Sequence, residues 1–118
     1  MTKKFGELIR QSRKDKGYSQ SELAKLVPLD VTYLSKLENH RAAYPPKEDV
    51  IRSLARSLDL DEEELIFLAG RMPERYEETL KQHYKTMPDL FRRLDQDREY
   101  REEVERGEIQ AESEGEQN

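Results

Sequence analysis

The chain has 118 residues, of which 34% are hydrophobic and 40% are charged, with no cysteine and a net charge of −5. A chain with so few apolar residues cannot form a large core. We therefore expect a few well-patterned helices in one small domain with an extension. The lack of Cys excludes a disulfide framework, thiol catalysis and Cys-ligated metal sites, and it fits a reducing cytoplasm.

No apolar run approaches the length needed to span a membrane. The N-terminal sequence MTKKFGELIRQSRKDKG is charged and amphipathic, and it lacks the apolar centre of a signal peptide. We therefore expect a soluble, cytoplasmic protein that does not contact membranes.

A first helix is predicted over residues 4–16, where Phe5, Leu8 and Ile9 recur at helical spacing. Gly17 stands where a left-handed helix end is expected. The next stretch predicts two short helices. Ser19 and Glu22 are spaced as a capping box that would begin the second helix.

Pro28 then lacks an amide N–H and disfavours a helical conformation for the residue before it, so the second helix must end there. Asp30 can cap a third helix from Val31 to about Asn39. This part of the chain is therefore predicted to run helix, tight turn, helix.

Two more helices complete a predicted five-helix unit over residues 1–70. Glu48 and Asp49 lie in the first turn of the fourth helix, and Asp61 and Gly70 bound the fifth. The fourth helix has a stripe of apolar residues, namely Val50, Ile51, Leu54, Ala55 and Leu58. Since no segment alternates as a strand would, the predicted fold class is all-α.

After residue 70, apolar residues persist at helical spacing: Tyr76, Leu80, Tyr84, Met87, Leu90, Phe91 and Leu94. They predict a helical extension over residues 71–101, whose apolar stripe could form a dimer interface or fold back on the first domain. Residues 102–118 contain seven acidic residues and few large aliphatics, so we expect a disordered acidic tail.

Charge is distributed unevenly along the chain. Residues 1–57 carry 12 Lys/Arg and 7 Asp/Glu, a net of +5, whereas residues 58–118 carry 9 and 19, a net of −10. A basic half can approach phosphate, whereas an acidic half is repelled by it. Ordinary scatter of surface charge is the simpler alternative.

The third predicted helix has an unusual outer face. With its leucines on the buried side, the residues that point away are Thr32, Ser35, Lys36 and Asn39. In a chain this charged, a solvated face would consist of Glu and Lys, so a short polar stripe without carboxylates indicates a binding surface.

The sequence RKDKGYSQSELAKLVPLDVTYLSKLENHR resembles the DNA-binding domain of lambda-repressor-like, XRE-type helix-turn-helix regulators. The shared pattern is Arg then Lys-Gly, Ser-Gln at the start of the second helix, Leu-Ala within it, and Leu-Glu-Asn at the end of the third. The resemblance covers roughly residues 4–69. It implies a five-helix domain that binds double-stranded DNA, with the third helix in the major groove.

The resemblance and the chemistry of the side chains together assign roles on the third helix. Lys36 suits the O6/N7 pair of guanine, and Thr32 offers a hydroxyl and a methyl group for thymine. Ser35 shares their face. Val31 and Tyr33 flank it, although partial core burial explains Val31 equally well and packing against the second helix explains Tyr33 nearly as well.

Three further residues match positions that contact phosphate in the family. Gln20 opens the second helix, where an anion is favoured, and Asn39 and Arg41 follow the third helix. Arg13 and Glu38 match a structural ion pair that would join the first helix to the end of the third. We assign that pair to the scaffold rather than to DNA contact.

The sequence departs from the family pattern at the turn, where Pro28 stands in place of the usual Gly. Because Pro cannot adopt positive φ, the turn type must differ, which could tilt the third helix. Asp30 also brings a carboxylate near the groove-facing end, either as a helix cap or as an acceptor for a cytosine amino group.

These features predict a DNA-binding transcriptional regulator, and specifically a repressor that acts as a homodimer on a palindromic operator. His40 and His83 have no partner at ligand spacing, and no nucleophile or phosphate-loop motif occurs, so we expect no metal, no cofactor and no enzymatic activity. The alternative is an antitoxin-like or protease-targeted module whose acidic C-terminal half binds a protein partner.

Overall fold

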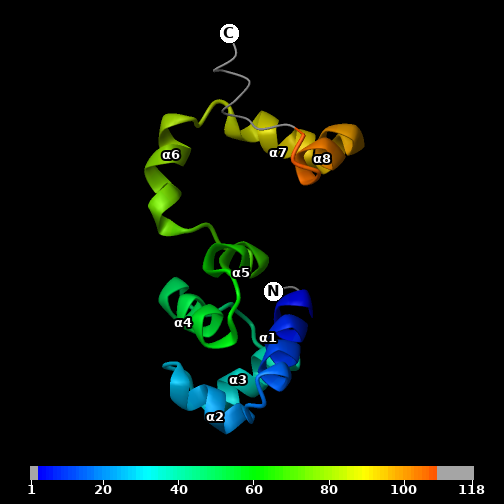
Figure 1. Ribbon diagram of the computed structural model, residues 1–118. Helices are drawn as coiled ribbons and strands as arrows, with labels where there is room; N and C mark the ends of the chain where they lie inside the picture. The colour runs from blue at the N-terminus through cyan, green and yellow to red at the C-terminus, as the bar shows by residue number, and fades with distance from the viewer. Residues whose placement is uncertain (1–2, 109–118) are drawn as a thin grey trace. The chain divides into compact units, whose positions relative to one another are not determined.

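The computed structural model describes residues 3–108, and within this range every regular element is helical, which confirms the all-α prediction (Figure 1). The chain divides into two compact units, one ending at Tyr76 and the other beginning at Glu77. The elements of the first unit are α1 Lys3–Asp15, α2 Gln20–Leu26, α3 Val31–Glu38, α4 Glu48–Leu58, α5 Glu62–Leu68 and the 3₁₀ helix η1 Glu74–Tyr76.

The caps of α2 and α3 form as predicted. The Ser19 hydroxyl accepts from the Glu22 amide at 3.0 Å, and the Glu22 carboxylate accepts from the Ser19 amide at 3.1 Å. The Asp30 carboxylate accepts from the Thr32 amide at 2.7 Å, so its charge is held as a helix cap.

The turn at Pro28 differs from the glycine turn that is usual in the family. The Leu29 amide donates to the Val27 carbonyl at 2.7 Å, which closes a three-residue turn centred on Pro28. Residues 27–30 need no positive φ, since Val27 lies at −125° and Asp30 at −74°. The predicted change of turn type is therefore confirmed.

The core of the first unit consists of one apolar cluster to which all five α-helices contribute. Its fully buried side chains come from every predicted stripe, and they include Phe5, Ile9, Leu23, Leu34, Leu37, Ile51, Leu54, Leu65 and Ile66. Each such side chain contributes about 1.5–3 kcal/mol by leaving water. The burial of Leu34 and Leu37 turns the opposite face of α3 to solvent.

Gly6 allows α1 to approach the end of α3 closely. A Cβ atom at this position would lie 2.3 Å from the Leu37 carbonyl oxygen and 3.0 Å from His40 Nδ1. Because the first of these is a backbone atom, the contact cannot be relieved by rotating a side chain. The absence of a side chain at Gly6 therefore permits the short distance between α1 and the end of α3.

The second unit contains α6 Glu77–Gln82, α7 Met87–Gln96 and α8 Arg98–Glu105. Helices α7 and α8 pack together, with Tyr100 buried and the Arg93 guanidinium 3.8 Å from the centre of its ring. The expectation of disorder from residue 102 is wrong for residues 102–105, because the Asp97 cap and the buried Tyr100 support a helix there. The rest of the predicted tail beyond residue 108 lies outside the described residues.

Residues 71–76 belong to the first unit and not to the extension in which the sequence placed them. They are joined to it by side chains, since the Glu48 carboxylate accepts from the Glu74 amide at 2.7 Å and the Tyr76 hydroxyl donates to Glu63 at 3.0 Å. Across residues 3–108, none of the helices combines the length and the apolar character required to cross a bilayer.

Gly6→Ala is expected to destabilise the protein by about 1–3 kcal/mol, because the new methyl group overlaps the Leu37 carbonyl and forces α1 from α3. Ala is otherwise the better helix former, so propensity alone would predict the opposite sign. Urea unfolding measures the change. The control is Glu7→Ala at the next, exposed position, which should shift stability by less than about 0.5 kcal/mol.

Candidate nucleic-acid interface

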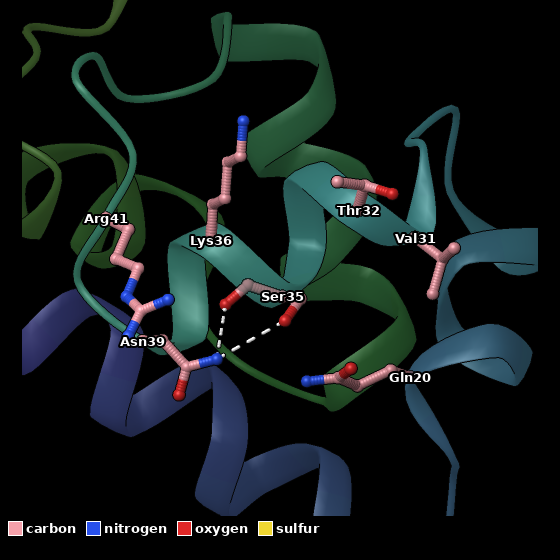
Figure 2. Close-up of a pocket in the computed structure, with 7 residues that line it drawn as sticks. All are labelled: Gln20, Val31, Thr32, Ser35, Lys36, Asn39 and Arg41. Carbon is pink, nitrogen blue, oxygen red and sulfur yellow. Dashed lines mark hydrogen bonds between the residues drawn. The ribbon is translucent and has the colours of Figure 1, made fainter.

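The outer face of α3 carries an open hollow of about 400 Å³ (Figure 2). Gln20 reaches it from α2, and Arg41 enters it from the chain that follows α3. The complete lining is Gln20, Val31, Thr32, Ser35, Lys36, Asn39 and Arg41. The structure therefore brings together on one surface all but one of the residues that the sequence predicted to bind DNA.

Tyr33 is the predicted residue that does not line the hollow. Its side chain is half-buried against the core, and its hydroxyl donates to the Tyr44 carbonyl at 2.9 Å. Burial raises the pKa of the Tyr33 phenol, so the hydroxyl stays protonated as a donor at neutral pH. Tyr33 therefore packs within the protein, as the alternative to DNA contact predicted. Its hydrogen-bond partner is the loop after α3 and not the second helix.

A buried ion pair holds α3 in place below the hollow. The Glu38 carboxylate, whose side chain is 1% exposed, accepts from Arg13 Nε at 2.8 Å and from Arg13 Nη2 at 2.9 Å. Gln20 Nε2 donates to the same carboxylate at 3.1 Å. These bonds tie α1, α2 and α3 together, which confirms the predicted pairing of Arg13 with Glu38.

The pair is fixed further by Arg13 Nη1, which donates to the Tyr18 carbonyl at 2.8 Å. Hydrogen bonding to Glu38 raises the pKa of Arg13 against the opposing effect of burial. The Glu38 carboxylate thus accepts three hydrogen bonds from side chains within the protein. The negative charge of Glu38 is neutralised and presents little repulsion to an anion on the outer face.

The end of α3 is shaped by a left-handed residue. His40 has φ of 60°, the Arg41 amide donates to the Lys36 carbonyl at 2.8 Å, and the His40 amide donates to the Leu37 carbonyl at 3.4 Å. This is the Schellman pattern of a helix end. Asn39 Nδ2 donates to the Ser35 carbonyl at 2.9 Å, so part of its amide serves the helix.

The hollow is positively charged and rich in hydrogen-bonding groups. Within residues 3–108, the Lys36 ammonium and the Arg41 guanidinium form neither hydrogen bonds nor ion pairs. Thr32 and Ser35 add hydroxyls between them, and Val31, which is 41% exposed, adds an apolar edge. The arrangement can attract phosphate and read a polar surface with short side chains.

The sequence predicted a phosphate contact for Arg41 but no role for the rest of the loop of residues 41–47. It begins at Arg41, which lines the hollow, and its Tyr44 side chain is 79% exposed. A possible signal was the pair Pro45-Pro46 beside an aromatic residue, which marks a stiff loop. In the part of the chain from residue 3 to 108, no cluster of acidic or His side chains is arranged to hold a metal ion.

The short helices α2 and α3, joined by a tight turn and with the outer face of α3 turned to solvent, form a helix-turn-helix unit. A family model described as "Helix-turn-helix domain" matches residues 4–66, so the chain belongs to this family of DNA-binding regulators, which are not enzymes. The resemblance inferred from the motif is confirmed.

Two similar proteins were found. The "ImmF control region 10 kDa protein" of Bacillus phage phi105 is 41% identical over 59 residues, which are 50% of this chain. The match spans 63% of the length of the phage protein. A solved structure titled "SinR protein/SinI protein complex" is 27% identical, covers 88% of this chain and 94% of its own, and aligns with a TM-score of 0.49.

Arg13→Ala is expected to cost about 3–5 kcal/mol of stability, because it leaves the buried Glu38 carboxylate without its main partner. Thermal and urea unfolding measure the loss. The control Arg10→Ala removes an exposed cation from the same helix and should have little effect. The double variant Arg13→Met with Glu38→Leu should recover most of the stability. Equal effects of Arg13→Ala and Arg10→Ala would show that solvent screens the pair.

Proposed function

We propose that this protein is a sequence-specific, double-stranded DNA-binding transcriptional regulator, and specifically a repressor that occupies a palindromic operator as a homodimer. The observation that supports it is the hollow on α3, where all the predicted DNA-binding side chains except Tyr33 gather around two cations that have no partner among the described residues. The name of the phage relative, which refers to a control region, agrees with a regulatory role. The protein would act in the cytoplasm, on the nucleoid.

The side chains of the hollow divide by chemistry into base-reading and phosphate-binding groups. Lys36 and Thr32 lie on the outer face of α3 and would reach base edges in the major groove, with Ser35 and Val31 beside them. Gln20, from α2, and Arg41, from the chain after α3, would contact phosphates of the DNA backbone. Asn39 would join Arg41 at the helix end.

Dimerisation follows from the size of the interface. One recognition helix contacts too few base pairs for selectivity, and two copies would bind half-sites about 34 Å apart. We assign the dimer contact to residues 77–101 of the second unit, where Tyr84 is 65% and Phe91 51% exposed. Sedimentation of Phe91→Glu against wild type tests this, since a charge in the contact should shift the protein toward monomer.

Selection of bound sites from random duplexes tests the function directly. A regulator of this kind should enrich a palindromic site and should lose affinity steeply as salt rises, because several phosphate counterions are released. The contrary outcome is affinity that stays weak for every sequence while a partner protein co-purifies. That result would favour the acidic C-terminal half as a protein-binding module.

Lys36→Ala should weaken binding to the selected site by about 1–3 kcal/mol and should relax preference at one base position, because a bidentate contact to guanine is lost. Fluorescence anisotropy with single-base variants of the site measures both effects. Arg106→Ala, which removes an exposed cation at the end of α8 and outside the assigned dimer contact, is the control. An unchanged base preference would remove Lys36 from base reading.

Arg41→Ala should weaken binding to all duplexes alike and should lower the slope of log affinity against log salt by roughly one, because a single phosphate contact disappears. The measurement compares the selected site with a scrambled duplex at several salt concentrations. A change in sequence preference would contradict a role limited to phosphate.

A further inference from the structure

The loop between α3 and α4 is held in place through hydrogen bonds to its backbone. The carbonyl groups of three successive residues accept hydrogen bonds from side chains elsewhere in the first unit. The Tyr44 carbonyl accepts from the Tyr33 hydroxyl at 2.9 Å, the Pro45 carbonyl from Arg71 Nη2 at 3.1 Å, and the Pro46 carbonyl from Arg71 Nε at 2.7 Å. Such a loop has little freedom to move on α3.

Arg71 is itself anchored on both sides. Before it, Gly70 has φ of 81° and the Arg71 amide donates to the Ile66 carbonyl at 3.1 Å, so the end of α5 sets its position. After it, the Glu74 amide is held by the Glu48 carboxylate at 2.7 Å. The Arg71 guanidinium, which bonds the loop, therefore projects from a segment that is itself held by hydrogen bonds.

The side chain of Tyr44 is left outside this rigid frame. It is 79% exposed, whereas Pro46, two residues further on, is buried and holds the loop against the protein. A single exposed aromatic residue needs no special explanation. Here, however, the Tyr44 carbonyl is held by the Tyr33 hydroxyl of α3, so the exposed side chain projects from a fixed backbone three residues after Arg41, which lines the hollow.

The charge around Tyr44 favours nucleic acid over protein as its partner. Arg41 and Lys47 flank it, and residues 39–47 contain no carboxylate. The loop leaves the hollow at Arg41, whereas Gln20 approaches the hollow from α2. A recognition helix in the major groove has a phosphate backbone on each side, so a loop that leads away from the hollow on α3 can meet one of them.

We propose that residues 41–47 form a second DNA-contacting element in which the Tyr44 hydroxyl donates to a backbone phosphate, with Tyr33 and Arg71 as positioning residues for the loop. The inference rests on the proposed function and extends it to residues outside the hollow. It assigns Tyr33 to holding the loop, and it makes DNA affinity depend on Arg71, which is distant from α3 in sequence.

Tyr44→Phe tests the contact. Loss of one neutral hydrogen bond should reduce affinity for the selected duplex by about three- to tenfold. The slope of log affinity against log salt should stay unchanged, because a phenol carries no charge and releases no counterion. The control is Ser53→Ala, which removes a hydroxyl from α4, outside both the hollow and the assigned dimer contact, and it should leave DNA binding unchanged.

Arg71→Ala tests positioning. It should weaken DNA binding in the wild-type background, and a large part of that loss should vanish when Tyr44 has already been changed to Ala, since the two residues act on one contact. Arg71→Lys keeps the charge but cannot bond both carbonyls in the same way, so it should restore little. A purely structural role for Arg71 would lower affinity equally in both backgrounds, which would overturn the positioning inference.

Failure of the inference differs from failure of the proposed function. If wild type binds no duplex with steep salt dependence, the proposed function fails. If wild type binds and Lys36→Ala weakens it, whereas Tyr44→Phe and Tyr44→Ala bind as tightly as wild type, only the loop inference is overturned. Loss of self-association in Tyr44→Ala with DNA affinity intact would make Tyr44 a protein contact and would also overturn it.

Discussion

The position of α3 depends on the buried Glu38 carboxylate and the donors that surround it. Glu38 comes from the last turn of α3, and it accepts from Arg13 on α1 and from Gln20 on α2. Leaving a carboxylate buried without these donors would cost several kcal/mol, so the three helices can pack only in the register that supplies them. The hydrophobic core sets the amount of stability, whereas this network sets the geometry that a binding surface requires.

The same network explains why a chain of net negative charge can present a cationic face. Near the hollow, the carboxylate of Glu38 is paired inside the protein, and that of Asp30 is held by the Thr32 amide at the start of α3. Lys36 and Arg41 remain unpaired among the described residues. Local pairing, rather than net charge, therefore decides the sign of the surface that a phosphate would meet.

Much of the first unit could be predicted because its signals are local. The Ser19 capping box, the Pro28 break and the Gly70 helix end each depend on residues within one helical turn. Helical periodicity also placed Thr32, Ser35 and Lys36 on one face without knowledge of the tertiary structure. The pairing of Arg13 with Glu38 joins distant residues, and it was accessible only through the family resemblance.

The contacts that hold the loop and the position of the domain boundary were not predicted. The residues that form these contacts lie far apart in the sequence and belong to no motif. Arg71 reaches carbonyls 25 and 26 residues earlier, and a carbonyl carries no sequence signal. The helix α8 was missed because its exposed positions are almost wholly charged, which is also the composition of disordered segments. Only its cap at Asp97 and the burial of Tyr100 distinguish it.

The ion pairs around α4 and α5 determine where the first unit ends. Arg52 lies between Glu48 and Glu62, and Arg75 bonds Glu63, whose pKa this contact lowers to about 2. Exposed pairs of this kind add little stability individually. Together they hold residues 71–76 against α4 and α5, and Arg71 lies at the start of that segment. A modest surface network thereby supports the segment from which the Arg71 guanidinium bonds the Pro45 and Pro46 carbonyls.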